Sequence, residues 1–240
     1  MMRNSRQLTT GARRSRNSLP VGQTAPVTID RDTTADRILA AAEHLLAEHG
    51  IDGTSLRAIT ERAAVNVAAV NYHFGSKEAL TLAVFDRLAE RVNNRRLADL
   101  EQILADAREK GVHPDLREII VCFIRPYFDP SPGESSPLLA QLVLQHRIAP
   151  SAVTREIIKR HFDPMAKRFI EALTLSCPAV DPTSLYWRYM FMTGAVVMTA
   201  TDQARKNRLA KLSGGKADMS DRGAAFDELV CFLMGAIAAP

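Results

Sequence analysis

Residues 56–80 read LRAITERAAVNVAAVNYHFGSKEAL, and this stretch predicts two short helices joined by a tight turn. Leu56, Ile59 and Ala63 repeat at helical spacing and mark the buried face of the first helix. Asn66 is a favourable N-cap residue, so a second helix of about two turns is expected from the next residue to Phe74. This arrangement is that of a helix-turn-helix.

Helices are also expected on both sides of the pair. Thr33 followed by Asp36 resembles a capping box, and Gly50 supplies the stop of a first helix. Thr54 is interpreted as the N-cap of the second helix. Ser76 is interpreted as the N-cap of a long helix that follows the pair. The region therefore predicts a three-helix unit and a long connecting helix.

The second helix of the pair is short enough for its first half to lie in the major groove of DNA, which is about 12 Å wide. Val70 and Phe74 are four residues apart and are expected to face the core. The opposite face would carry an amide for an adenine edge, small apolar groups for thymine methyls, and donors for phosphates. Its expected residues are Val67, Ala68, Asn71 and Tyr72, with His73 at the edge.

Two helix N-termini in this region offer anion sites, because backbone N–H groups and the helix dipole both favour negative charge there. One follows Thr54 and the other follows Ser76. Lys77 adds a full positive charge at the site after Ser76. Arg57, one turn into the helix that follows Thr54, does the same at the other site. These positions indicate contacts with the phosphate backbone.

On these residues the sequence resembles the TetR family of regulators, over about residues 34–88. The family pattern is a helix with an IA-x-x-AGVS turn, followed by Tyr-x-His-Phe-x-Ser-Lys-x-x-Leu. It stands here as Ile59-Thr60, Ala63-Ala64-Val65-Asn66 and Tyr72-His73-Phe74-Gly75-Ser76-Lys77-Glu78-Ala79-Leu80. Ala64 replaces the usual turn glycine and Asn66 the capping serine; alanine is strained if that position needs positive φ.

The resemblance implies an all-α fold with an N-terminal three-helix helix-turn-helix headpiece and a C-terminal helical ligand-binding and dimerisation domain. It implies a homodimeric repressor that binds a pseudo-palindromic operator in double-stranded DNA and leaves it when a small-molecule effector binds. The expected segments are a disordered basic tail (1–32), the DNA-binding domain (33–80) and the ligand-binding and dimerisation domain (81–240). The implied DNA surface is Thr54, Arg57, Asn66, Val67, Ala68, Asn71, Tyr72, His73 and Lys77.

Charge is distributed unevenly along the 240 residues, whose net charge is +4. Residues 33–80 contain four basic and six acidic side chains, so this headpiece does not supply long-range attraction to DNA. The tail carries no acid before Asp30 and is expected to contact the minor groove or the DNA backbone. The five arginines before Asp30 are Arg3, Arg6, Arg13, Arg14 and Arg16.

The remainder of the chain also reads as helices, with no strand of convincing alternation. Pro164 is expected to kink or divide one of them, because proline cannot donate a backbone hydrogen bond. The expected helices are Pro114 to Phe128, Pro137 to Ile148, Ser151 to Ser176, about Pro182 to Leu209, and Asp221 to Ala238.

The run LYWRYMFMTGA at residues 185–195 resembles a subgroup of the family that responds to fatty acids or acyl-thioesters. An apolar effector with an acidic head is therefore the hypothesis, with His146 and Arg147 recognising the head unless they form an ordinary exposed face. The aromatic and methionine side chains from Trp187 to Met198 are expected either to line a ligand pocket or to form the core of the helix bundle. The candidate pocket residues are Phe123, Tyr127, Leu142, His146, Arg147, Phe169, Trp187, Met190 and Phe191.

The last helix carries an apolar stripe that would be core in a monomer. In the family, the last helices of two subunits pair, so the stripe is expected to form the dimer interface. Its residues are Phe226, Leu229, Val230, Leu233, Met234 and Ile237.

Other classes of function find no support in the sequence. There is no nucleophile elbow, phosphate loop or zinc-protease motif, so no catalytic residue is assigned and the chain is not expected to be an enzyme. Three widely spaced cysteines predict neither a disulfide framework nor a metal site, and favour a reducing cytoplasm. The longest uncharged apolar stretch, Tyr189 to Thr201, is too short to span a membrane, and no cofactor or membrane partner is expected.

Two alternatives remain from sequence alone. One is a helical DNA-binding protein without an effector, which would bind independently of sequence and with a steep salt dependence. The other is an enzyme that acts on apolar substrates in the C-terminal domain, against which stands the absence of a nucleophile with a paired base.

Overall fold

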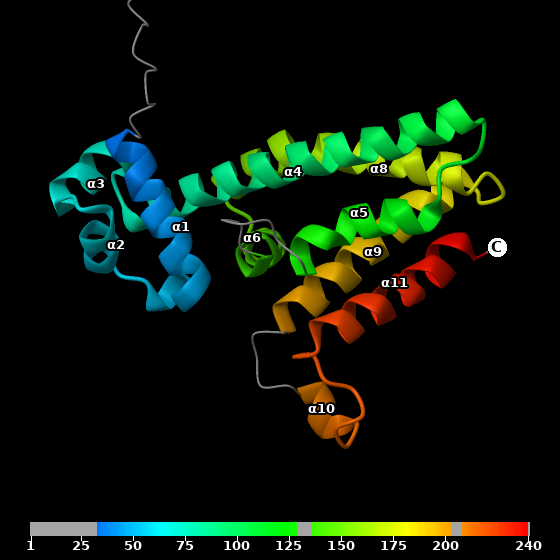
Figure 1. Cartoon of the computed structure of the whole chain (residues 1–240). Helices are drawn as coiled ribbons and strands as arrows, with labels where there is room; N and C mark the ends of the chain where they lie inside the picture. Colours follow the sequence, from blue (N-terminus) through cyan, green and yellow to red (C-terminus); the bar gives the residue numbers. More distant parts are fainter. Residues whose placement is uncertain (1–32, 129–135, 203–207, 240) are drawn as a thin grey trace, which may run out of the picture. The chain divides into compact units, whose positions relative to one another are not determined.

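The computed structural model describes residues 33–128, 136–202 and 208–239, and within these ranges all regular structure is helical (Figure 1). The predicted all-α class is confirmed. The predicted tail, residues 1–32, lies outside the described residues, and so do the five arginines before Asp30. The elements are α1 Thr34–Gly53, α2 Leu56–Ala63, α3 Val67–Phe74, α4 Lys77–Lys110, α5 Leu116–Phe128, α6 Ser136–Ile148, α7 Ala152–Ile157, the π-helix η1 Ile158–Phe162, α8 Asp163–Ser176, α9 Pro182–Asp202, α10 Arg208–Leu212 and α11 Arg222–Ala238.

Local hydrogen bonds define the ends of the first helices. Thr33 and Asp36 form the predicted capping box at the start of α1, and Gly50, with φ of 73°, interrupts its helical geometry. The Asn66 side chain accepts from the Ala69 N–H at 2.8 Å, as an N-cap of α3 must. Ser76 caps α4 in the same way. The N-cap of α2 is one residue later than predicted, because Ser55 and not Thr54 accepts from the first turn.

The turn between α2 and α3 contains a strained alanine. Ala64 has φ of 52° and ψ of 51°, and it is the only residue other than glycine with positive φ among those described. A left-handed conformation costs an L-residue about 1–2 kcal/mol, since its Cβ crowds the following carbonyl. The strain expected from the replacement of the usual glycine is therefore present.

Helices α1 to α3 pack around one apolar centre and attach to the start of α4 (Figure 1). Ile38, Ile59 and Val70 are each no more than 1% exposed and hold the three helices together. Polar contacts also join α1 to α4. The Arg91 Nη2 donates to Glu43 Oε1 at 2.5 Å, and Glu43 is almost fully buried.

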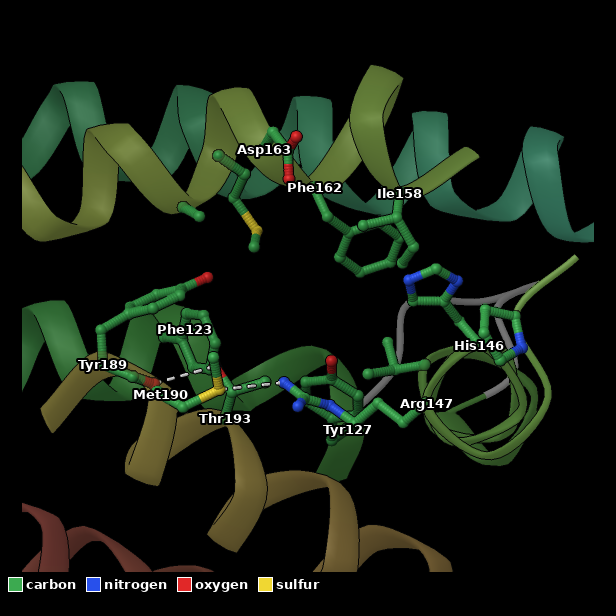
Figure 2. Close-up of a pocket in the computed structure, with 14 residues that line it drawn as sticks. Phe123, Tyr127, His146, Arg147, Ile158, Phe162, Asp163, Tyr189, Met190 and Thr193 are labelled. Carbon is green, nitrogen blue, oxygen red and sulfur yellow. Dashed lines mark hydrogen bonds between the residues drawn. The ribbon is translucent and has the colours of Figure 1, made fainter. Parts of the chain in front are cut away.

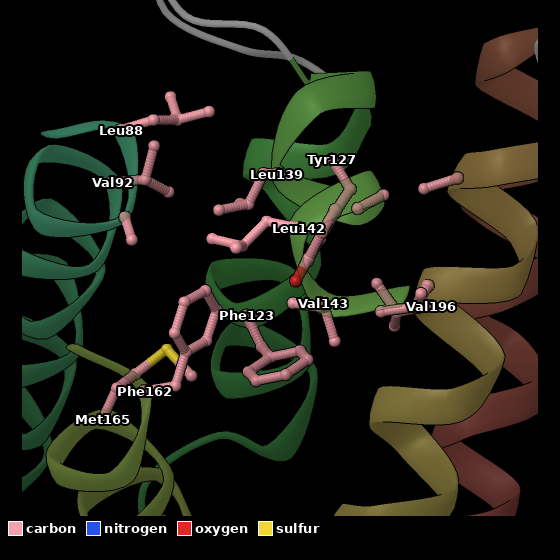
Figure 3. Close-up of a cluster of buried hydrophobic side chains, with 14 of the residues drawn as sticks. Leu88, Val92, Phe123, Tyr127, Leu139, Leu142, Val143, Phe162, Met165 and Val196 are labelled. Carbon is pink, nitrogen blue, oxygen red and sulfur yellow. The ribbon is translucent and has the colours of Figure 1, made fainter. Parts of the chain in front are cut away.

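Helix α4 continues as one helix past residue 80, where the predicted boundary between the two domains lies. In its later turns it packs against α5 and α8, while α5, α9 and α11 contact one another (Figure 1). Figure 3 shows the core formed where these helices meet α6. Side chains labelled there include Leu88, Val92, Phe123, Tyr127, Leu139, Leu142, Val143, Phe162, Met165 and Val196.

The helix predicted over residues 151–176 is divided before Pro164, as expected. It consists of α7, the five-residue π-helix η1 and α8, and proline occupies the first turn of α8, where its missing N–H has no role. The helix predicted over 182–209 ends at Asp202, and α10 begins at Arg208.

Arginines from other helices satisfy the last carbonyls of two helices. Arg188 of α9 donates to the Ile237 and Ala239 carbonyls at 2.7 and 2.6 Å, at the end of α11. Arg222 of α11 donates from Nε to the Phe128 carbonyl at 3.1 Å, at the end of α5. Since such carbonyls have no partner within their own helix, these bonds fix α11 against its two neighbours.

No helix in the described part of the chain combines the length and the apolar character needed to cross a membrane.

Candidate functional site

Helix α3 presents the face that its residue spacing predicts. Val70 is fully buried and Phe74 half-buried, so the opposite side of the helix points to solvent. Tyr72 is 85% exposed and Val67 is 45% exposed. The remaining predicted residues on α3 and its cap, Asn66, Ala68, Asn71 and His73, are also exposed.

Adjacent rings restrain the end of this face. The Tyr72 ring meets the His73 ring edge-on, with 5.1 Å between their centroids. His73 also lies 6.2 Å from the Phe74 ring, which is half-buried against the headpiece core. These contacts favour one orientation of the exposed rings, so the side chains lose less conformational entropy when they bind a partner.

The prediction that Thr54 contacts DNA is wrong. Its side chain is 2% exposed, and its hydroxyl donates to the Leu45 carbonyl at 3.0 Å and to the Gly50 carbonyl at 2.7 Å. The break at Gly50 leaves carbonyls at the end of α1 without helical partners. Thr54 satisfies them, so it holds the α1–α2 connection together instead of facing DNA.

The two predicted cations differ in their availability. Arg57 is 87% exposed, and its Nε donates to Glu61 Oε1 at 2.8 Å, one turn along α2. This hydrogen bond raises the pKa of the Arg57 guanidinium. Lys77 is half-buried, and its Nζ donates to the Ile51 carbonyl at 2.8 Å. Lys77 therefore ties the start of α4 to the segment after α1, besides placing a charge there.

A cavity of about 550 Å³ lies between α5, α6, η1, α8 and α9 (Figure 2). This volume suits a small organic ligand. Phe123, Tyr127 and Met165 form its inner end and are at most 2% exposed. Arg147 and Met190 lie at its exposed rim.

Five of the nine predicted pocket residues line this cavity, and they are Phe123, Tyr127, His146, Arg147 and Met190. Leu142 and Phe169 are fully buried core residues outside the lining, so their prediction as pocket residues is wrong. Trp187 and Phe191 are 64% and 66% exposed and point away from the cavity, because they lie on the outer side of α9.

Polar groups are few and separated around the cavity. Arg147 contacts the Met190 sulfur at 3.4 Å, and no carboxylate in the described ranges lies within ion-pair distance of it (Figure 2). His146 Nδ1 is 3.2 Å from the Thr154 hydroxyl. Burial raises the pKa of Tyr189 well above its usual range, so this lining phenol stays a neutral donor. Asp163 contributes the carboxylate of the lining, and it is exposed.

Sequence reasoning missed Arg96, which lies directly behind the inner end of the cavity. Its guanidinium is 4.7 Å from the centroid of the Tyr127 ring, and the residue is 1% exposed. The signal was present: the apolar stripe of α4 runs through Val84, Leu88 and Val92 in steps of four, and Arg96 is the next member. A charged residue on a buried stripe needs a physical reason.

The stripe predicted as the dimer interface packs inside the chain. Leu229, Val230, Leu233 and Ile237 are at most 7% exposed, since α11 lies against α5 and α9. Phe226 meets Phe128 with ring centroids 5.7 Å apart, and Met234 is half-buried. Leu229, Val230, Leu233 and Ile237 are therefore core residues of their own chain, while a contact of the half-buried Phe226 and Met234 with a partner stays a prediction. The large apolar groups exposed on these helices are others, among them Trp187, Phe191 and Met198 of α9 and Phe232 of α11.

No cluster of three or more histidine, cysteine, aspartate or glutamate side chains in the described ranges is arranged to hold a metal ion.

Comparison with known proteins links both parts of the chain to one family. Residues 38–84 match bacterial regulatory proteins of the tetR family, and residues 121–236 match the tetracyclin repressor-like C-terminal domain. An HTH-type transcriptional repressor of Mycobacterium tuberculosis is 31% identical over 162 residues, which cover 59% of this chain and 78% of that protein. The HTH-type transcriptional regulatory protein RaaS of the same organism is 32% identical over 151 residues, which cover 60% of this chain and 68% of RaaS.

A solved structure shares the fold. A TetR transcription regulator from Haloarcula marismortui aligns over 84% of this chain and 97% of its own, with a TM-score of 0.57 and 17% identity. With the helix-turn-helix headpiece, the C-terminal helical domain and these matches, the chain belongs to the TetR family of bacterial transcriptional regulators.

Proposed function

We propose that this protein is a homodimeric repressor that binds a pseudo-palindromic operator through α3 and leaves it when a small apolar acid fills the C-terminal cavity. Members of the TetR family bind operator DNA and small-molecule effectors and act as dimers. The observation that carries the proposal is the exposed face of α3, fixed by the Asn66 cap and the buried Val70. The two recognition helices of a dimer would enter successive major grooves, about 34–36 Å apart.

Within that face we assign sequence reading to Asn71 and positioning to Tyr72. An asparagine amide pairs in two places with an adenine edge, which distinguishes adenine from the other bases. Tyr72 is 85% exposed, and its hydroxyl suits a hydrogen bond to a phosphate oxygen. Arg57 would join them by exchanging Glu61 for a phosphate.

The π-helix η1 gives the cavity a direct connection to α4. Ile158 and Phe162 of η1 line the cavity. Between them, His161 Nε2 lies 2.8 Å from Asp86 Oδ1, and the His161 carbonyl accepts from Asn93 Nδ2 at 3.1 Å. Both partners are on α4, which begins at the headpiece. A ligand that displaces η1 would therefore shift α4 and change the spacing of the two recognition helices.

Such a ligand releases the operator only by the difference between its affinities for the two arrangements of α4. The largely apolar lining, with Arg147 and His146 near the rim, supports an apolar effector with an acidic head. Fatty acids and acyl-thioesters are the two chemical classes of effector that fit this description.

We assign the dimer face to the outer sides of α9 and α11. Trp187, Phe191 and Met198 follow one another along α9 with helical spacing, and each is more than 60% exposed. Phe232 on the adjacent α11 is 62% exposed. Gly194 and Gly235 have open space where a Cβ would lie, which permits a partner helix to come close. Large exposed apolar groups of this kind mark an interface.

Footprinting of DNA upstream of the protein's own coding region tests the proposal. We expect protection of a palindrome by the wild type and by the control Lys110→Ala, and its loss in Asn71→Ala and Tyr72→Ala. Lys110 is an exposed residue at the far end of α4. Binding without a footprint and with a steep salt dependence would instead identify a sequence-independent DNA-binding protein.

A further inference from the structure

Arg96 of α4 is a fully buried cation on the inner side of the cavity wall. Its guanidinium lies 5.2 Å from the Phe123 centroid and 4.7 Å from the Tyr127 centroid, within the range of cation–π contacts. Its Nη1 is 3.7 Å from the Met165 sulfur. These three side chains also line the cavity, so each contacts the guanidinium on one side and borders the ligand space on the other.

The hydrogen bonds of Arg96 are incomplete. Nη1 donates to Asn93 Oδ1 at 3.0 Å, whereas Nε and Nη2 are buried and have no acceptor among the described residues. No carboxylate in those ranges forms an ion pair with the guanidinium. A buried charge with unsatisfied donors is costly, so proteins normally pair or hydrogen-bond such groups fully.

The two donors without acceptors share one edge of the guanidinium. In arginine, the Nε–H and one Nη2–H point in parallel, in the fixed fork that matches two oxygens of a carboxylate. The occupied donor, Nη1, belongs to the opposite side of the group. The vacant donors are thus the pair that one carboxylate would satisfy.

We infer that Arg96 anchors the effector, which is a free carboxylic acid whose head group enters the cavity first. This inference rests on the proposed function and chooses between its two forms of effector. The carboxylate would take both vacant donors on Arg96, and the apolar tail would lie along Ile158 and Phe162 toward the rim.

Arg96 is not itself part of the lining, so the head group reaches it only if a side chain of the inner end moves, and Met165 is suited to such a movement. A methionine side chain has three rotatable bonds and adapts to neighbouring groups at low cost. Tyr189, which stays a neutral phenol, also lines the cavity and suits the carboxylate as a hydrogen-bond donor. The carboxylate of the lining, Asp163, is exposed, so it does not neutralise the inner end.

An acyl-thioester does not meet these requirements. Its carbonyl is uncharged and offers one oxygen, whereas the vacant edge of Arg96 has two donors. Its carrier is bulky and polar, and would remain at the rim beside Arg147. The charge of such a ligand would then lie at the exposed end of the cavity and leave Arg96 unpaired.

Calorimetry with purified full-length protein tests the inference. The probes are straight-chain carboxylates from butyrate to dodecanoate, phenylacetate, the alcohol of the same skeleton for each, and decanoyl-coenzyme A. We expect at least one carboxylate to bind, with its alcohol and the thioester bound at least about 30-fold more weakly, as for a lost partner of a buried charge. Equal binding of acid and alcohol, preferred binding of the thioester, or no binding by any carboxylate would overturn it.

Variants separate Arg96 from the rim. Arg96→Met removes the charge and keeps an apolar filling, so we expect unchanged or higher thermal stability, since replacing a buried unpaired charge relieves its desolvation. The affinity of Arg96→Met for the carboxylate should be about 30-fold or more below that of the wild type, whereas Arg147→Met should lose much less affinity. If Arg96→Met fails to fold, Arg96→Lys keeps the charge without the two-donor edge and should weaken carboxylates more than alcohols. Retained carboxylate affinity in the folded variant would refute the role of Arg96.

Operator binding is measured separately by fluorescence anisotropy. Arg96→Met should bind the operator like the wild type but no longer be released by the carboxylate. If the wild type binds carboxylates through Arg96 yet protects no operator, the proposed function fails and the ligand site stands. If the operator is bound and carboxylates are not, the inference alone fails.

Discussion

The position of Thr54 gives the sharpest test of the headpiece structure. Thr54→Val keeps the shape of the side chain and removes its hydroxyl, which donates to the Leu45 and Gly50 carbonyls. Both acceptors lose a partner in a site where Thr54 is 2% exposed. A buried polar group left unsatisfied costs about 1–3 kcal/mol, and other donors near a helix end recover part of this. We expect a loss of about 1–2 kcal/mol in local stability.

Hydrogen exchange followed by mass spectrometry measures this loss in the headpiece alone. Exchange of amides at the end of α1 and in α2 should quicken about 5- to 30-fold, because that factor corresponds to 1–2 kcal/mol in an opening equilibrium. Amides of α8 and α11 should be unchanged. Thr54→Ser retains the hydroxyl and is the matched control, with exchange within a factor of a few of the wild type.

The contrary result is well defined. If Thr54→Val exchanges like the wild type but binds the operator many-fold more weakly, the threonine contacts DNA and the buried position is incorrect. If Thr54→Ser quickens exchange and Thr54→Val does not, the methyl packing and not the two hydrogen bonds holds the connection.

Four further predictions follow from single features. Ala64→Gly should stabilise the headpiece by up to about 1 kcal/mol, as relief of a left-handed alanine exceeds the added chain entropy of glycine, and the same exchange assay measures it. Trp187→Arg should convert the proposed dimer to a monomer, as measured by light scattering, whereas an unchanged molecular mass would show that Trp187 does not contribute to the interface. Asp86→Asn should keep operator affinity but reduce effector release about 2- to 30-fold in anisotropy titrations, because it weakens the contact with His161. Burial raises the pKa of Cys122 to about 11, so at pH 8 only about one thiol in a thousand is ionised and iodoacetamide should label it only on unfolding; fast labelling of the native protein would contradict its burial.

Features that depend on neighbours in the sequence were predictable. The Asn66 and Ser76 caps, the stop at Gly50 and the inward side of α3 rest on interactions within four residues, so spacing and residue type suffice. The strain at Ala64 was equally local, since it follows from one backbone position.

Features that depend on distant segments were not predictable in the same way. Periodicity shows that α11 has an apolar side, but not that Leu233 meets α5 and α9 of its own chain instead of a partner. The position of Thr54 was misjudged because one of its acceptors, the Leu45 carbonyl, lies nine residues back. Only part of the cavity lining was predictable. Tyr127 and Arg147 are residue types that suit a ligand site, whereas the presence of Tyr189 instead of Trp187 in the lining depends on the rotation of α9 about its axis.

The π-helix η1 makes the cavity adjustable by chain length. Each of its hydrogen bonds spans one residue more than in an α-helix, so η1 holds an extra residue between α7 and α8. Deleting one residue there would restore α-helical winding, and α7 and α8 would keep nearly the same facing, because about five residues of a π-helix turn as far as about four of an α-helix. The change would fall on η1 itself, which contributes Ile158 and Phe162 to the ligand wall, while Met165, beyond the segment, would stay. The length of η1 therefore sets the size of the cavity on this side independently of the side chains at its inner end.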